Sequence, residues 1–259
     1  MGDPLRANRY DHLTPHFMAD AKKAANRGKK RGKKYRAALE KIDRKKLYTL
    51  DEAVKLLEET STTKFDGTAE VHLKLGLDPK QSDQMIRGTL ALPHGTGKQV
   101  RVIAFVDEGK VKEAKSAGAI EAGSDDLIEK IHKGWLEFDV AVATPDQMKK
   151  LGKVAKTLGQ KGLMPNPKAG TVSPEPAKTI EEIKKGRIEY KLDKEANVHN
   201  IFGKISFGAG KLAENLKVYL KTIQEVRPSA VKGNYINSIT VTSTMGPGIK
   251  INPNEVTAL

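Results

Sequence analysis

Cysteine is absent from this chain of 259 residues, and aromatic residues make up only 5% of it. Without cysteine there can be no disulfide bond and no thiolate metal site, which fits a reducing compartment. The chain also lacks any apolar run of about 18 residues, so we expect no membrane-spanning helix. Its composition, 38% hydrophobic and 30% charged, is typical of a soluble globular protein long enough for two domains.

Sequence patterns for catalysis are missing as well. The segment from His94 to Lys98 weakly resembles a phosphate-binding loop, but Leu92 stands where the first glycine belongs and Gln99 replaces the hydroxyl residue that binds Mg²⁺. The histidines at positions 72, 94, 132 and 199 form no cluster with metal-ligand spacing, and we interpret each as an ordinary surface or core histidine. We therefore predict no catalytic residue, no cofactor and no metal site.

Positive charge is in excess, with a net charge of +14. Residues 1–36 hold 11 Lys or Arg against 3 Asp or Glu, so more than half of the excess lies at the N-terminus. We predict that residues 1–34 form a basic, disordered extension, either a solvated charge run or an arm along nucleic-acid phosphates. Met18, which a lysine-rich run follows, is an alternative start of translation. The remaining chain is only mildly basic, so specific binding there must also rest on shape and hydrogen bonding.

Both ends of the remaining chain show the patterns of an α+β domain. Before residue 95 we expect a helix after a capping box at 49–52 and strands near 69–75 and 86–92. After residue 187 we expect strands near 188–192 and 198–207, an amphipathic helix near 212–223 that ends before Pro228, and a last strand at 236–243. Neither half holds enough elements for a core of its own.

The middle of the chain alternates strands and helices. Residues 100–106 are a nearly continuous apolar run, as a parallel strand covered on both faces requires. We expect a second strand at 138–143 and helices near 110–117, 125–133 with Ser124 as cap, 145–158, and after a capping box at 179–182. The sequence thus predicts an α/β protein in which residues 96–186 form an α/β domain inserted into an α+β outer domain of residues 35–95 and 187–259. Hinges are expected near residues 95 and 187.

The strand at 236–243 and the turn after it form the main candidate binding surface. Threonines alternate with apolar residues there, so we expect Thr242 and Thr244 on the exposed face. Met245 is then an exposed apolar residue beside Gly246, which lets a ligand approach the backbone closely. An ordinary half-buried strand that ends in a turn is the simpler interpretation of the alternation alone.

Two further segments carry side chains of the same kinds. Phe65 and Thr68 are expected at the start of a strand, and Lys204 and Ser206 on one face of another. Basic, hydroxyl and exposed apolar groups at strand surfaces recognise RNA through its phosphates, 2′-hydroxyls and bases. Together these segments predict RNA binding rather than catalysis.

Several longer motifs are similar to those of one known family. They are the segments 33–38 (KKYRAA), 64–66 (KFD), 82–84 (SDQ), 87–89 (RGT), 92–98 (LPHGTGK), 162–172 (GLMPNPKAGTV) and 243–247 (STMGP). On these the chain resembles the large ribosomal subunit protein L-one family, whose members belong to the mobile lateral stalk. The resemblance covers about residues 33–252, and the proline-rich segment 162–172 is its most specific part.

The resemblance implies an RNA-binding outer domain and a Rossmann-like inserted domain. It implies a non-enzymatic monomer of the cytoplasmic ribosome that binds large-subunit rRNA at the stalk, takes part in release of exit-site tRNA and represses its own mRNA. Carried over by position, it places the RNA contacts on Phe65, Thr68, Lys204, Ser206, Thr242, Thr244, Met245 and Gly246. The long N-terminal extension departs from the common bacterial form of the family.

Two other functions compete with this one. Residues 96–186 are also compatible with a nucleotide-dependent enzyme, although no glycine-rich motif follows Val106, and Asp107 and Glu108 would repel a pyrophosphate. A solely regulatory mRNA-binding protein would carry the same surface and would differ by not cosedimenting with large subunits.

Overall fold

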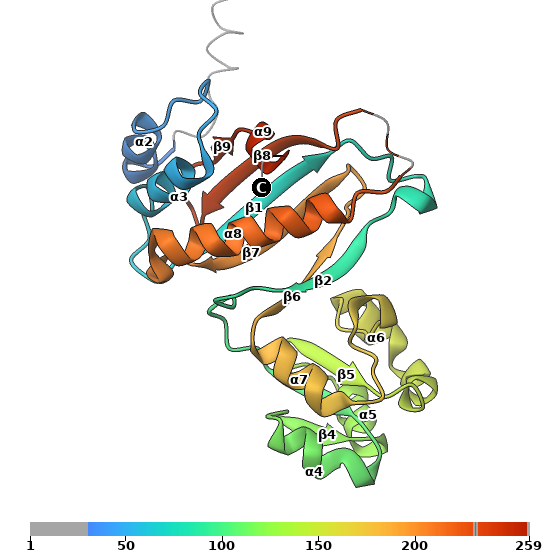
Figure 1. Cartoon of the computed structure of the whole chain (residues 1–259). Helices are drawn as coiled ribbons and strands as arrows, with labels where there is room; N and C mark the ends of the chain where they lie inside the picture. Colours follow the sequence, from blue (N-terminus) through green and yellow to red (C-terminus); the bar gives the residue numbers. More distant parts are fainter. Residues whose placement is uncertain (1–30, 230, 232, 258–259) are drawn as a thin grey trace, which may run out of the picture.

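A computed structural model describes residues 31–229, 231 and 233–257 as a mixed α/β fold. Both ends of the described chain build one sheet, and the middle builds another (Figure 1). The predicted α/β class is therefore confirmed. Most of the predicted extension lies outside the described residues, although Lys33 and Lys34, which we assigned to it, begin helix α2 (Lys33–Glu40).

The larger sheet has the strand order β7-β1-β8-β9 and is antiparallel throughout. Its strands are β1 (Thr68–Leu75), β7 (Asn197–Lys204), β8 (Ile236–Ser243) and β9 (Ile249–Ile251). The predicted alternation of β1 holds, because Ala69, Val71, Leu73 and Leu75 are buried while the residues between them are more exposed. One face of the sheet therefore belongs to the core, and the other carries polar groups.

Helices α3 (Leu50–Glu59) and α8 (Gly208–Glu225) pack on the apolar face, and a short helix, α9 (Asn254–Thr257), ends the described chain (Figure 1). The predicted capping box of α3 is present, since Thr49 Oγ1 accepts from the Glu52 amide and Glu52 Oε2 accepts from the Thr49 amide, both at 3.3 Å. Helix α8 buries the predicted stripe and ends before Pro228.

The smaller sheet is parallel, with the order β4-β3-β5. Its central strand β3 (Val102–Phe105) is buried along its whole length, between β4 (Glu121–Gly123) and β5 (Val140–Ala143). Val102 and Ala104 pack with helices α4 (Glu108–Ser116) and α7 (Pro176–Lys184). Ile103 and Phe105 pack on the other side with α5 (Asp125–His132) and α6 (Ala155–Lys161). The apolar run is continuous because helices cover both faces.

Three local predictions in the middle of the chain are wrong. Thr179 does not open α7, because Pro176 stands at its first turn and the Thr179 hydroxyl donates to the Glu175 carbonyl at 3.3 Å. Ser124 precedes α5 without capping it, since its hydroxyl donates to Gln147 Oε1 at 2.7 Å. The helix expected at 145–158 is a 3₁₀ segment, Gln147–Lys153, followed by α6. Strand β4 was missed because its three residues carry no strand pattern.

Two strands, β2 (Arg87–Ala91) and β6 (Arg187–Lys191), join the two parts of the molecule and pair with each other as an antiparallel ribbon. At its end Gly95 and Gly186 have φ angles of +65° and +101° and lie so close that a Cβ on Gly186 would overlap Gly95. Asn215 of α8, fully buried, accepts from the His94 amide at 3.0 Å and donates to the Gly95 carbonyl at 3.0 Å. The linker is therefore fixed to the larger part up to Gly95.

The proline-rich segment 162–172 also lies against this linker. Its Gly170 packs on the guanidinium of Arg187, which donates to Glu182 at 2.6 Å and to Thr89 Oγ1 at 2.8 Å. Arg187 thus connects β2, β6 and α7. We retain the domain boundaries at residues 95 and 187 as a proposal that these glycines and anchors support.

Replacing Gly186 by alanine tests the close approach of the two linker segments. The Gly186→Ala protein should lose more than about 1 kcal/mol of stability, because the new Cβ has an unfavourable φ and overlaps Gly95. Denaturant unfolding measures the loss. The matched control is Gly159→Ala in α6, where a Cβ meets nothing within 4 Å and should stabilise the protein by about 0.5–1 kcal/mol. A Gly186→Ala protein as stable as the wild type would show that the approach is not required.

Candidate nucleic-acid interface

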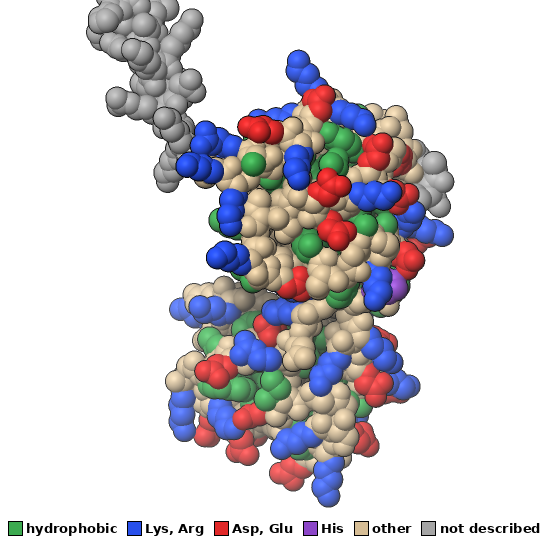
Figure 2. All heavy atoms as spheres, turned by 90° about the vertical axis from the view of Figure 1, so that its left-hand side faces the viewer, with side chains coloured by type: hydrophobic (Ala, Val, Ile, Leu, Met, Phe, Trp, Pro, Cys, Tyr) green, Lys and Arg blue, Asp and Glu red, His purple; other side chains and the backbone are tan. Residues whose placement is uncertain are grey.

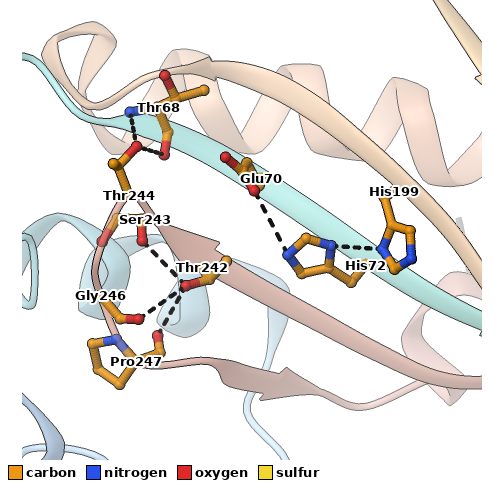
Figure 3. A network of polar contacts seen from close by, with 9 residues as sticks. All are labelled: Thr68, Glu70, His72, His199, Thr242, Ser243, Thr244, Gly246 and Pro247. Carbon is orange, nitrogen blue, oxygen red and sulfur yellow. Dashed lines mark hydrogen bonds and ion pairs between the residues drawn. The ribbon is translucent and has the colours of Figure 1, made fainter. Parts of the chain in front are cut away.

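The candidate surface lies where β8 ends beside the start of β1 (Figure 3). Thr244 makes hydrogen bonds to the Thr68 backbone with both its amide and its hydroxyl: the amide donates to the Thr68 carbonyl at 3.0 Å, and the hydroxyl oxygen accepts from the Thr68 amide at 2.9 Å. A hydroxyl oxygen has two lone pairs and one proton. The same hydroxyl donates its proton to the Thr68 carbonyl in a long bond of 3.4 Å, so one lone pair of Thr244 Oγ1 is left, and the side chain is half-buried.

Thr242 of β8, two residues before Thr244, has a different role. Its hydroxyl lies within 3.2 Å of the Ser243 carbonyl, 3.3 Å of the Gly246 carbonyl and 3.5 Å of the Pro247 carbonyl (Figure 3). A single proton is shared among these oxygens, so the hydroxyl supports the turn. What it can still offer a ligand is a lone pair.

The turn after β8 carries two unusual residues. Met245 has a φ of +61°, a conformation that only glycine and asparagine adopt easily, and 76% of its surface is exposed. Gly246 has no room for a side chain, because a Cβ would overlap the Ser243 hydroxyl and lie 3.1 Å from the Ser243 carbonyl. The turn therefore holds an apolar side chain outward at a conformational cost of about 1 kcal/mol or more.

Gly246 is consequently required for the shape of the turn itself. Its amide donates to the Ser243 carbonyl at 2.8 Å, which closes the turn. The Ser243 hydroxyl beneath it is buried and has no hydrogen-bond partner among the described residues. Any side chain at Gly246 would disturb this packing, so a substitution there changes the protein as well as its surface.

The two other predicted segments converge on the same place. Lys204, at the end of β7, donates from Nζ to Thr68 Oγ1 at 2.8 Å. Thr68 therefore contacts Thr244 through its backbone and Lys204 through its side chain. These partners are 176 and 136 residues away in sequence. Phe65, in the loop before β1, is 63% exposed.

Ser206 is placed differently from the prediction. It lies in a 3₁₀ turn, Ile205–Phe207, and not on a strand face with Lys204. At the start of this turn the Ile205 amide donates to the Gly67 carbonyl at 2.9 Å. The Ser206 hydroxyl donates to Asp66 Oδ2 at 2.8 Å, and its amide donates to the other carboxylate oxygen at 3.1 Å. Asp66 thus fixes the loop that presents Phe65, a role that we did not infer from the sequence.

A cleft of about 490 Å³ extends from Thr68 and Lys204 along the polar face of β1 and β7 toward the linker. The charged residues that line the cleft have both signs: Lys98, Arg187 and Lys204 are basic, and Glu70 and Glu189 are acidic. The surface seen in Figure 2 likewise intersperses basic side chains with acidic and apolar ones over both parts. Such a surface gives little undirected attraction for a polyanion, so recognition depends on placed hydrogen bonds and shape.

Groups that would hold a metal with three or more protein ligands are absent from the described part of the chain. Over the same residues, no helix is long and apolar enough to cross a membrane. The chemistry available at the interface is therefore hydrogen bonding by Thr244 and Lys204 together with apolar contact by Phe65 and Met245.

Comparison with known proteins shows which family the chain belongs to. Residues 57–247 match the model of the Ribosomal protein L1p/L10e family. A protein of Mycobacteroides abscessus named large ribosomal subunit protein uL1 is 54% identical over 86% of this chain and 95% of its own length. Proteins of the same name from Salinispora arenicola and Thermobifida fusca are 53% and 52% identical, over 86% and 87% of this chain and 94% and 96% of theirs. The chain therefore belongs to the ribosomal protein L1 family.

Proposed function

We propose that this protein is a structural, non-enzymatic constituent of the large ribosomal subunit in the cytoplasm that binds rRNA of the lateral stalk through the end of its larger sheet. The curated relatives named for that subunit support the assignment. The observation that carries the binding site is the convergence of three distant segments on Thr68, with Thr244 on one side and Lys204 on the other.

The proposed contacts follow from the chemistry of these groups. Thr244 Oγ1 offers its remaining lone pair to the proton of a ribose 2′-hydroxyl, and its own proton would have to leave the long bond to the Thr68 carbonyl to donate to RNA as well. Lys204 suits a phosphate, and contact with one would replace its bond to Thr68. Met245 and Phe65 present apolar surface to ribose or base faces, where stacking tolerates any base. Ser206, Thr242 and Gly246 complete the predicted contact surface, mainly by shaping it.

Two finer functions and the oligomeric state belong to the same proposal. The same surface would bind a mimic of the rRNA site in the protein's own mRNA, which would make free protein a repressor. The smaller part, joined through Gly95 and Gly186, would follow the stalk while exit-site tRNA is released. The protein would act as a monomer in the ribosome.

Cosedimentation separates the ribosomal role from a solely regulatory one. We expect the tagged full-length protein to migrate with large subunits in a sucrose gradient and to remain there at high salt, where contacts of a basic arm are screened. Protein found only in the ribosome-free fractions, with its mRNA bound, would show that regulation is its sole function.

The Thr244 hydroxyl is tested by comparing Thr244→Val with Thr244→Ser. Valine keeps the shape but leaves the Thr68 amide without its acceptor, so we expect a stability loss of about 1 kcal/mol. It also removes the RNA contact, which should weaken binding to stalk rRNA by a further 1–3 kcal/mol, or about 5- to 150-fold in Kd. Serine should bind like the wild type. Equal affinity of the folded valine and serine proteins at high salt would exclude the hydroxyl contact.

Met245→Gly separates the exposed side chain from the backbone that carries it. Glycine adopts the φ of +61° without strain, which offsets the extra freedom it gives the unfolded chain, so stability should change by less than about 1 kcal/mol. Affinity for the rRNA fragment should fall about tenfold or more, because a buried methionine contributes about 1.5–3 kcal/mol. Met85→Ala, a change at another exposed methionine, should leave affinity unaltered. A Met245→Gly protein with wild-type affinity would remove Met245 from the contact surface.

A further inference from the structure

Two histidines face each other on the polar side of the larger sheet. His72 of β1 and His199 of β7 are direct cross-strand partners, and their Nδ1 atoms are 2.9 Å apart (Figure 3). The rings meet edge to face, with centroids 5.0 Å apart. Both side chains line the cleft described above and are accessible, with exposed fractions of 32% for His72 and 54% for His199. Nothing in the proposed RNA contacts uses them.

The outer nitrogen of each ring lies near a carboxylate. His72 Nε2 is 3.9 Å from Glu70 Oε2, and His199 Nε2 is 3.4 Å from Asp193 Oδ2. A neutral imidazole carries one N–H, and a neighbouring carboxylate favours it on the nitrogen that faces the carboxylate. With both rings protonated at Nε2, the two Nδ1 lone pairs face the same space in the cleft and can bind one cation together. With one ring protonated at Nδ1, the same two atoms form a neutral N–H···N hydrogen bond instead.

An additional proton that would turn the His72 ring into an imidazolium is disfavoured. Desolvation by burial lowers the pKa of His72, and the nearby His199 lowers it further, against the opposing effect of Glu70. A metal ion can bind both Nδ1 lone pairs without protonating either ring. In proteins, imidazoles that bind a metal commonly donate their other N–H to a carboxylate, which sets the tautomer and orients the ring.

The spacing also indicates the kind of metal. Bonds of about 2.0–2.1 Å from one ion to two nitrogens 2.9 Å apart enclose an angle of about 90°. That angle belongs to neighbouring positions of a tetragonal site, the geometry of Cu²⁺ and Ni²⁺, whereas a tetrahedral Zn²⁺ site needs wider spacing. We propose that His72 and His199 form a two-imidazole site for a divalent transition metal ion with tetragonal preference, Cu²⁺ or Ni²⁺. Water in the open cleft would fill the remaining positions.

Titration of the full-length protein with Cu²⁺ alone, followed by calorimetry and electron paramagnetic resonance, tests the site. We expect a tetragonal spectrum with two nitrogen ligands. His72→Asn and His199→Asn should each weaken this binding at least tenfold. The His199 change is structurally mild, since β7 is an edge strand and the side chain is more than half exposed. Thermal unfolding confirms that each variant is folded.

Two controls identify copper bound elsewhere. His132→Asn changes an exposed histidine of α5, and the double variant His12→Asn with His16→Asn changes the two histidines of the N-terminal segment. Both controls should retain the two-nitrogen signal. The proposal fails if that signal survives in the His72 and His199 variants, or if it disappears with His12 and His16. It also fails if no copper binds and nitrogen-15 spectra show one proton shared between the two Nδ1 atoms.

Discussion

The register of β1 against its two neighbours is the constraint on which the rest of the interface depends. β1 is hydrogen-bonded to β7 on one side and to β8 on the other, which pairs Thr68 with Lys204 and Ala69 with Ser243. A slip of one residue would turn every side chain of a strand to the opposite face. Ala69, Val71 and Leu73 are buried in the core, and a slip would expose these apolar side chains to solvent, so their burial prevents it. Core packing therefore fixes the position of the surface threonines.

The turn after β8 contains two features that lower the stability of the fold locally. Met245 occupies a left-handed conformation, and the Ser243 hydroxyl is buried without a partner among the described residues. Both features are destabilising on their own. Thr242 and the closing Gly246 amide hold the turn in place nonetheless. Rigid support of an exposed apolar group reduces the entropy lost when a partner binds it.

Sequence patterns predicted the elements whose formation is governed by local rules. The alternation of apolar and polar residues predicted β1 and β8, the capping box predicted α3, and the apolar run predicted β3. Predictions failed where a distant group competes. Ser124 bonds to Gln147 instead of capping, and Ser206 turns toward Asp66. The residue types of the candidate site could likewise be predicted, but its contacts could not, because Thr68 meets Thr244 and Lys204 only through the tertiary pairing of strands.

The linker and the proposed RNA surface are not independent of each other. Asn215 holds the linker to α8 up to Gly95, and Gly97 and Gly186, both with positive φ, lie in the segments where we propose the hinges. Gly97 lies against the aliphatic stem of Lys204, where a Cβ would come within 2.7 Å. A rotation at the proposed hinge would change the space around Lys204. Because Lys204 also bonds to Thr68, such a rotation would reach the proposed contact surface through one side chain.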